Sequence, residues 1–222
     1  MSRRAFRSIR LTGGATLFLT AALLVGAAPP AWAKAAKPPK CGKMSFPASG
    51  QTTAYTADKN NGVGADTVPD DGTVEAGATL SYVDNGDGTV TDLNTGLQWE
   101  KKVTGSSCLH CVDDTYRWSG DGSQETIWDW LGDVNTEGGT GFAGHSDWRI
   151  PNVKELQSIV IYEVNSPAID PVFGDTGYDH WSSSTIAGGT TNAWSVSLGD
   201  GGVFGDDKTV SHVVRAVRGG CL

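Results

Sequence analysis

Cysteine, histidine and aspartate supply the side chains of this sequence that are best suited to chemistry. Cys108 and Cys111 are separated by two residues, one of which is His110. The pair could form a disulfide, a redox centre or part of a zinc site, but zinc needs about four ligands and no second C-x-x-C follows. Four cysteines allow three connectivities. We predict structural disulfides Cys108–Cys111 and Cys41–Cys221, the second of which would join the two ends of the folded domain.

A glycine-rich turn from Asp84 to Gly88 carries two carboxylates that could bind calcium. An EF-hand loop needs oxygen ligands at alternate positions and a glutamate six residues after its glycine. Asp84 and Asp87 are three residues apart and no such glutamate follows, so only a weak calcium site is left open and no other cofactor is predicted. The Asn85-Gly86 pair between two β-prone segments predicts a hairpin instead.

The sequence contains no familiar catalytic motif. A nucleophile elbow, an H-E-x-x-H motif, a P-loop and a dinucleotide fingerprint are all absent. His145, Ser146 and Asp147 are the residue types of a catalytic triad, but adjacent side chains point in different directions and cannot form the relay. Aspartate is so frequent that two nearby carboxylates do not indicate a glycosidase. We therefore predict that the protein is not an enzyme.

The first 33 residues have the features of a signal peptide. Four arginines precede a short apolar run over residues 17–28, and a small-x-small cleavage site follows at residues 31–33. The run is too short to span a membrane. We predict cleavage after Ala33 and export to the periplasm or the cell exterior, by the general or the twin-arginine route. No transmembrane segment is predicted in the remaining chain.

The mature chain is strongly acidic. Cleavage would remove four of the 17 basic residues and none of the 25 acidic ones, so the net charge of −8 would become −12. This charge argues against nucleic acid and anionic lipid as partners. It also opposes a simple electrostatic attraction to sulfated polysaccharide. The 189 residues that remain of the 222 are enough for one sizeable core.

Two amphipathic helices are predicted in the core. The first covers residues 125–134, and the second begins at Pro151 and carries apolar residues between positions 153 and 160. Trp128 and Trp130 lie in the first helix. They could be platforms for sugar rings, but we expect them to pack in the core.

Short strands account for most of the other apolar residues. Alternation at Trp194, Val196 and Leu198 is typical of a half-buried strand. The other predicted strands cover or begin at residues 80–83, 90, 97–99, 181–184, 203–204 and 212–217. Arg149 and Arg215 are expected to be paired, because an unpaired buried guanidinium is too costly.

These elements predict an α+β fold in which two helices pack on short, irregular antiparallel sheets. Residues 34–49 form a polar, proline-bearing lead-in, and residues 50–222 are predicted to be a single domain. The segment from Pro167 to Asn192 is expected to be largely a long connection on the surface.

Five ordered motifs resemble the DUF1566 family, which is named for the C-terminal domain of the Legionella collagen-like adhesin. They are DNGDGTVTDLNTGLQW, FAGHSDWRIPNVKELQSIV, HWSSST, AWSVSLGDGGV and VRAVRGG, and the resemblance covers roughly residues 50–220. The chain lacks the collagen-like G-X-Y repeats of the adhesin. The resemblance implies an exported or surface-exposed bacterial domain.

More remotely, W-R-I-P, W-S-S-S and V-R-A-V-R look similar to C-type-lectin-like and formylglycine-generating-enzyme folds. The lectin calcium motifs E-P-N, Q-P-D and W-N-D are absent, and the active-site cysteines of the formylglycine enzymes have no counterpart. The resemblance to the adhesin suggests binding of sulfated glycans, which the acidic charge opposes.

We predict a noncatalytic binding module of the bacterial surface or envelope, whose ligand is a glycan or another surface molecule. The candidate ligand-binding residues are Tyr178, His180 and Asn192, because they offer an aromatic face and hydrogen-bonding groups in the predicted long connection. An envelope assembly component with a protein partner is the alternative. An extracytoplasmic enzyme of unrecognised type is the third possibility.

Overall fold

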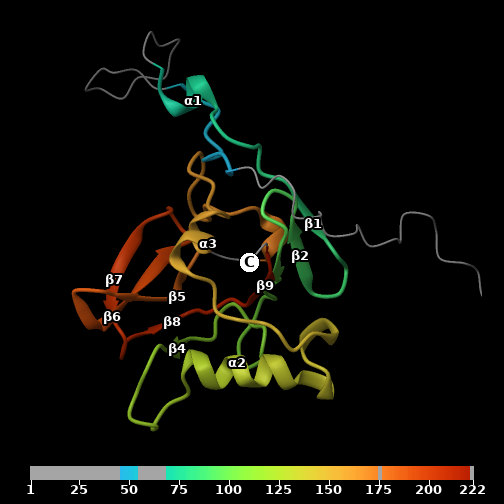
Figure 1. Ribbon diagram of the computed structural model, residues 1–222, viewed down its shortest axis with the longest axis vertical. Coiled ribbons are helices and arrows are strands. Elements are labelled where there is room, and N and C mark those ends of the chain that lie inside the picture. Colours follow the sequence, from blue (N-terminus) through green and yellow to red (C-terminus); the bar gives the residue numbers. More distant parts are fainter. Residues whose placement is uncertain (1–45, 55–68, 175–176, 221–222) are drawn as a thin grey trace, which may run out of the picture. The chain divides into compact units, whose positions relative to one another are not determined.

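The computed structural model describes residues 46–54, 69–174 and 177–220. The predicted signal peptide and both cysteines of the predicted Cys41–Cys221 bond lie outside these residues. Within them, small antiparallel sheets combine with a few short helices, which confirms the α+β class (Figure 1). In this part of the chain every helix is too short or too polar to cross a membrane.

The first sheet has the order β1 (Tyr82–Asp84), β2 (Thr89–Asp92), β3 (Leu97–Glu100) and β9 (Val217–Gly219), and all neighbours are antiparallel. β1 and β2 form the hairpin that Asn85-Gly86 predicts. Gly86 has a φ of 77°, and the Asp84 carboxylate accepts a hydrogen bond from its amide at 2.9 Å. The turn therefore uses both a glycine and an aspartate side chain.

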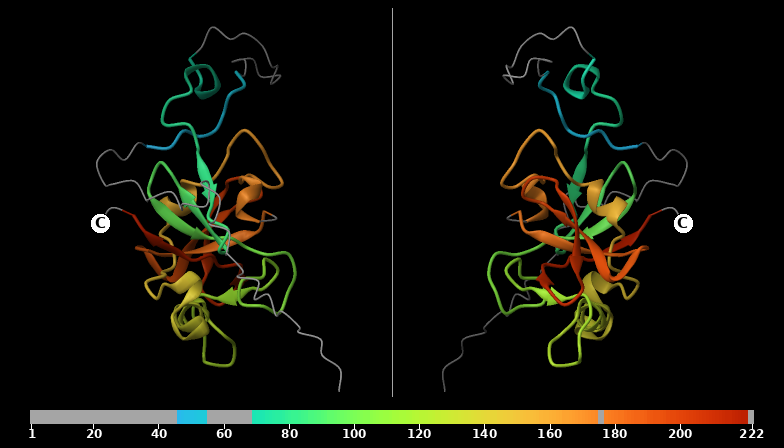
Figure 2. Two further views of the ribbon diagram at one scale, coloured as in Figure 1. Left: turned by 90° about the vertical axis from the view of Figure 1, so that its right-hand side faces the viewer. Right: turned by 90° about the vertical axis from the view of Figure 1, so that its left-hand side faces the viewer.

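A three-stranded sheet of β5 (Asp179–Ile186), β6 (Gly189–Ser197) and β7 (Val203–Asp207) faces the viewer in the right-hand panel of Figure 2. β5 and β6 form a long antiparallel hairpin with irregular register. The expectation of a long surface connection between Pro167 and Asn192 is therefore wrong. Beyond the strand predicted at residues 181–184, its Ser, Thr and Gly residues show no apolar alternation, and the backbone pairing of β5 with β6 determines the structure there.

The longest helix, α2 (Ile127–Thr136), begins two residues later than predicted. A reciprocal capping box between Thr126 and Asp129 fixes this start. Trp130 is fully buried as expected, but Trp128 is 41 % exposed, so the expectation that it packs in the core is wrong. Two positions apart in a helix, these side chains point in different directions.

The second predicted helix is shorter than its apolar pattern suggests. α3 covers only Val153–Gln157, and Asn152 caps it, so Pro151 precedes the cap and does not lie in the first helical turn. Val160 is buried as expected but lies beyond the helix, because it forms a β-bridge with Ile169. The apolar residues after α3 therefore keep the helical spacing in the sequence, although the backbone there is no longer helical.

The closing segment is two strands and not the single strand predicted over residues 212–217. β8 (Ser211–His212) pairs with β4 (Tyr116–Arg117), and the chain then crosses to β9. Between them, Trp181 N donates to Val213 O at 2.9 Å and Glu100 N donates to Ala216 O at 3.0 Å. The backbone hydrogen bonds of this segment are thus shared between β5 and β3, which prevents one continuous ladder.

Two clusters of buried side chains form the core. One surrounds Trp99 and Phe173 beside the four-stranded sheet, and the other surrounds Trp130, Trp148 and Trp181 beside α2. The remaining described α-helix, α1 (Asp71–Val74), is a single turn capped by Asp70, and short 3-10 helices cover Glu137–Gly139, Phe142–Gly144 and Pro171–Phe173. The second cluster packs beside α2 and against Leu109 of the loop that carries Cys108 and Cys111.

Candidate functional site

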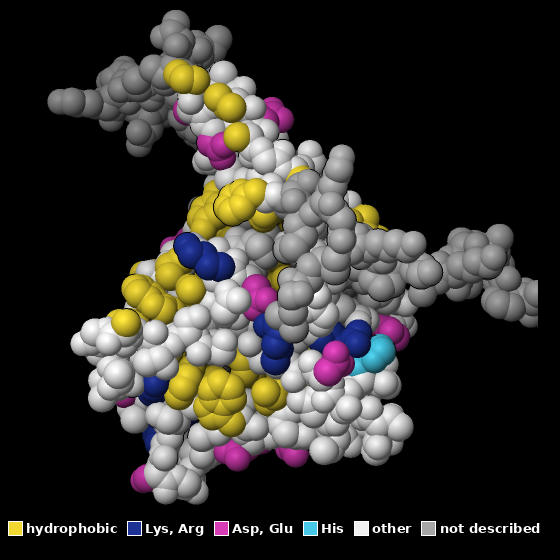
Figure 3. Space-filling model, in the orientation of Figure 1, with side chains coloured by type: hydrophobic (Ala, Val, Ile, Leu, Met, Phe, Trp, Pro, Cys, Tyr) yellow, Lys and Arg dark blue, Asp and Glu magenta, His cyan; other side chains and the backbone are white. Residues whose placement is uncertain are grey.

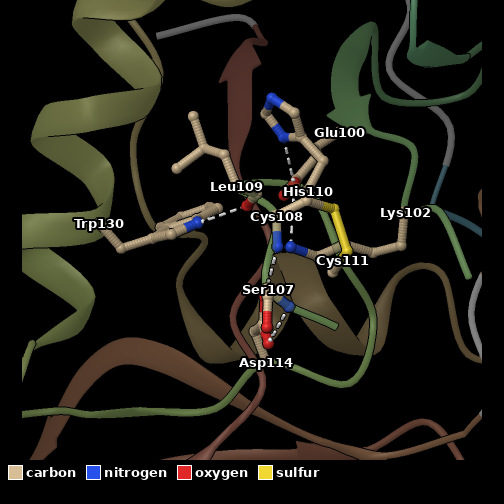
Figure 4. Close-up of a disulfide and its surroundings, with 9 residues drawn as sticks. All are labelled: Glu100, Lys102, Ser107, Cys108, Leu109, His110, Cys111, Asp114 and Trp130. Atoms are coloured by element: carbon tan, nitrogen blue, oxygen red, sulfur yellow. Dashed lines mark hydrogen bonds and ion pairs between the residues drawn. A yellow bond between two sulfur atoms is a disulfide. The ribbon is translucent and has the colours of Figure 1, made fainter. Parts of the chain in front are cut away.

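A disulfide loop lies against α2. Cys108 and Cys111 are bonded with an S–S distance of 2.02 Å, which confirms this predicted pair (Figure 4). The Asp114 carboxylate accepts the amides of Ser107 and Cys108 at 2.9 and 3.0 Å. This nearby negative charge opposes formation of a thiolate, so the environment favours a structural bond over a redox centre.

The tip of this loop is anchored to α2 from its other side. The indole Nε1 of Trp130 donates to the carbonyl oxygen of Leu109 at 2.8 Å, as Figure 4 shows. Trp130 is fully buried, so this polar contact is made at the edge of the core. The disulfide and the indole together hold the loop in one position relative to the helix.

A buried ionic cluster contacts the disulfide loop through His110. Glu100 Oε1 is 2.8 Å from Lys102 Nζ and 2.7 Å from His110 Nδ1, and Glu100 Oε2 accepts the Ala216 amide at 2.9 Å. His110 Nε2 is 3.2 Å from Glu137 Oε2. The Glu100 and Lys102 side chains are 0 % and 1 % exposed. A buried charge of this kind requires partners, and here each has one.

The cluster shifts the protonation equilibria of its members. Burial alone would raise the pKa of Glu100, but Lys102 and His110 outweigh it and lower the pKa to about 2. Burial alone would lower the pKa of His110, but contacts with Glu100 and then Glu137 outweigh it and raise the pKa. Glu100 is therefore ionised at neutral pH, and His110 is poised to titrate above its ordinary range.

Arg149 and Arg215 are both paired, as predicted. Arg149 makes a two-pronged ion pair with Glu155, with N–O distances of 2.7 and 2.6 Å. Arg215 is fully buried and donates to the carbonyl oxygens of Glu100 and Phe173. Arg215 thus braces the strand that carries Glu100, and neither arginine is available as a ligand clamp.

An open cavity of about 570 Å³ lies between the disulfide loop and α2. We call it the acidic groove, and it is lined by Ser107, Cys108, Leu109, Asp113, Asp114, Thr115, Tyr116, Glu125 and Asp133. Its charged residues are all acidic. Among the described residues, none of its four carboxylates forms an ion pair, and Glu125 and Asp133 accept no side-chain hydrogen bond.

Acidic residues recur every fourth position through α2 and the residues that flank it, at Glu125, Asp129, Asp133 and Glu137. Figure 3, which has the orientation of Figure 1, shows acidic side chains at the lower edge of the view, beside the position of α2. Asp129 and Asp133 both lie within α2, and like charges four residues apart destabilise a helix by about 0.2–0.5 kcal/mol per pair. Burial, and then Asp133, Asp129 and Asp114, raise the pKa of Glu125. The groove is therefore a region of mutually repelling carboxylates.

The structure does not bring the three predicted ligand-binding residues together. Tyr178 is 46 % exposed, and its hydroxyl donates to Asp113 Oδ1 at 3.2 Å, so it borders the acidic groove. His180 is fully buried, with Nδ1 2.9 Å from Tyr178 O, and cannot contact a ligand at the surface. Asn192 pairs with Asp207 in the sheet of β5–β7.

The carboxylates of the predicted calcium turn have other partners. Asp84 pairs with Lys101 Nζ at 2.6 Å, and Asp87 accepts hydrogen bonds from Thr89. Among the described residues, no group of three or more histidine, cysteine, aspartate or glutamate side chains is arranged to hold a metal ion.

A second histidine–carboxylate cluster contains the residue types of a triad in another arrangement. His212 Nε2 is 3.0 Å from Asp206 Oδ2, and the buried Ser195 hydroxyl bonds to the same oxygen. In a catalytic triad the histidine lies between the serine and the carboxylate. Here the carboxylate lies between them, so the histidine does not activate the serine.

A mainly apolar cavity of about 430 Å³ is lined by residues of α3 and by Phe46, Leu97, Tyr162 and Gly220. Its charged residues Arg149 and Glu155 pair with each other. The functional candidate is therefore the acidic groove, whose four carboxylates have no basic partner in the described part of the chain. Sequence reasoning missed Glu100, Lys102 and the groove carboxylates, although the four-residue spacing along α2 was a readable signal.

Comparison with known proteins places the fold in a family. Residues 88–218, more than half of the chain, match the family model described as the Lcl C-terminal domain. This confirms the resemblance inferred from the five motifs, over a shorter range. A search of curated proteins found no match.

Proposed function

The chain belongs to the Lcl C-terminal domain family, and from this premise we propose that it is an exported, noncatalytic binding module of the bacterial surface or envelope. A lectin-like or formylglycine-enzyme-like fold is the finer architecture we propose for it. The acidic groove is the proposed binding site. The observation that carries the proposal is the set of four carboxylates that face this groove without a basic partner among the described residues.

Charge indicates the chemistry of the ligand. Positive groups would relieve the repulsion among Asp113, Asp114, Glu125 and Asp133, and the strongly acidic chain would attract them from a distance. A sulfated polysaccharide would meet repulsion at the same place. We therefore propose an amine-bearing glycan, such as a polymer of deacetylated amino sugar.

An exposed aromatic residue of α2, the helix that contributes Asp133 to the groove, favours a glycan over a basic protein. Trp128 lies in the first turn of α2 and packs edge-to-face on Trp118, with ring centroids 5.0 Å apart. Lys208 Nζ lies 3.8 Å from the Trp118 ring, so the open surface of this pair is that of Trp128. An exposed indole offers an apolar face on which a sugar ring can stack.

The test compares two oligosaccharides of matched length. Oligomers of glucosamine carry an amine that is protonated at mildly acid pH, and oligomers of N-acetylglucosamine do not. Calorimetry on the mature protein should detect binding of the first and not of the second, and the affinity should fall as salt is added. Heparin oligosaccharides should not bind.

Neutralising the groove should weaken this binding. The double variant Glu125→Gln/Asp133→Gln removes two carboxylates that have no structural hydrogen bond and should weaken binding by on the order of tenfold, or about 1.4 kcal/mol. Asp200→Asn is the control for a carboxylate outside the groove, because it neutralises an exposed turn aspartate in another part of the chain. Equal binding by both variants would remove the groove as the site, and binding of basic protein but no glycan would favour the assembly alternative.

A further inference from the structure

His110 joins two parts of the molecule through its two ring nitrogens. Nδ1 faces Glu100 of β3 at 2.7 Å, and Nε2 faces Glu137, the residue that follows α2, at 3.2 Å. The ring also packs on Phe142 with centroids 4.0 Å apart. His110 lies between Leu109 and Cys111, so these contacts tie the disulfide loop to the end of α2.

The protonation state determines which of these contacts is attractive. A neutral imidazole has one N–H, whereas an imidazolium donates from both nitrogens. Glu100 is ionised and fully buried, so the single N–H of neutral His110 stays on Nδ1. Nε2 then presents a lone pair to the Glu137 carboxylate, and a favourable hydrogen bond becomes repulsion.

We propose that His110 is a proton-controlled clasp that holds the disulfide loop against the end of α2 and so sets the shape and charge of the acidic groove. In the protonated state both carboxylates are held. On deprotonation the Glu137 contact is released while the Glu100 contact remains. This inference rests on the proposed function only where it concerns ligand binding.

The other charged groups near His110 do not change which of its two contacts depends on the proton. Lys102 shares Glu100 Oε1 with His110 and is fixed there, also lying 4.9 Å from the Trp130 ring centroid. Arg215 contacts the backbone carbonyl of Glu100. Glu137 is the exposed partner, with a side chain 41 % accessible, so it is the contact that can separate without leaving a buried charge.

Release of Glu137 would alter the groove at its edge. Asp133 lines the groove and lies one helical turn before Glu137. Deprotonation therefore adds a free carboxylate to the acidic row and removes a positive charge from beside it. A cationic ligand should bind more tightly once His110 has lost its proton.

The test follows His110 directly by NMR of the mature protein labelled at histidine, with the signal assigned through His110→Gln. The wild-type ring should titrate above the ordinary histidine range. Glu137→Gln should lower that midpoint, whereas the control Asp133→Asn, which removes the same charge one turn earlier, should lower it much less. The protection of the amides at residues 105–112, corrected for the intrinsic rise of exchange with pH, should fall above the midpoint in the wild type and in Asp133→Asn but not in Glu137→Gln.

Ligand binding forms a separate arm of the experiment. N-trimethylated glucosamine oligomers keep a fixed charge, so any pH dependence comes from the protein. Their affinity should rise about two- to fivefold across the His110 titration, and Glu137→Gln should abolish the rise. A midpoint that does not respond to Glu137→Gln overturns the clasp. A Glu137-dependent midpoint and loop exchange support it even if no oligomer binds, a result that would count against the proposed function alone.

Discussion

Acidic residues on two sides of the molecule have different surroundings. Beside β6–β8, Asp206 contacts His212 and Ser195, and Asp207 accepts hydrogen bonds from Thr209. Beside α2, Glu125 and Asp133 have no comparable partner among the described residues. The acidic residues therefore differ in their surroundings. Some carboxylates stabilise turns and strands, and under the proposed function those beside α2 are available to bind a ligand.

The largest predicted effect concerns the buried charges that support the groove. Glu100→Gln leaves Lys102 buried without its carboxylate, and we expect a loss of about 3–5 kcal/mol in the free energy of unfolding, measured by urea denaturation. Asp84→Asn, which breaks the half-exposed pair with Lys101, should cost less than about 1 kcal/mol. Similar losses for the two variants would contradict the view that the cluster is a structural foundation.

The next effect concerns the disulfide. Replacing both Cys108 and Cys111 by serine removes a very short closed loop, and the chain-entropy model gives a loss of about 2 kcal/mol. Ligand affinity should fall as well, because the loop forms one wall of the groove. Chemical denaturation and calorimetry on the same sample would separate the two effects. Unchanged affinity in the folded variant would show that the wall is not part of the site.

A smaller effect is expected from pH. The raised pKa of His110 means that its contribution to stability is complete below the pKa of the unfolded chain, about 6.5, and is lost as pH rises through the higher folded value. The lowered pKa of Glu100 acts oppositely, and its contribution is lost as pH falls towards about 2. The stability difference between wild type and His110→Gln should therefore shrink as pH rises through the His110 titration. A constant difference would contradict the charged state of His110.

Local patterns in the sequence predicted the elements with strong local causes. Asn85-Gly86 identified a hairpin, the C-x-x-C spacing identified a disulfide, and apolar periodicity located α2. Each of these depends on residues that are close together in the chain. The five family motifs added the family itself, which composition alone could not provide.

Predictions failed where distant segments decide the structure. Residues 213–216 divide their hydrogen bonds between β5 and β3, and the polar Ser182 of β5 is buried. The groove likewise joins Asp113 and Asp114 of one loop to Glu125 and Asp133 of the helix region. Periodicity within one segment carries no information about contacts between segments that are distant in the sequence.

The most direct test of the account is NMR mapping of a glucosamine oligomer on the mature protein at mildly acid pH. The account predicts that backbone shifts concentrate at residues 107–116 and 125–133, with little change in β5–β7. Shifts confined to the sheet of β5–β7, or no shifts at ligand concentrations that saturate a weak site, would contradict the claim that the unpaired carboxylates of the acidic groove hold the ligand.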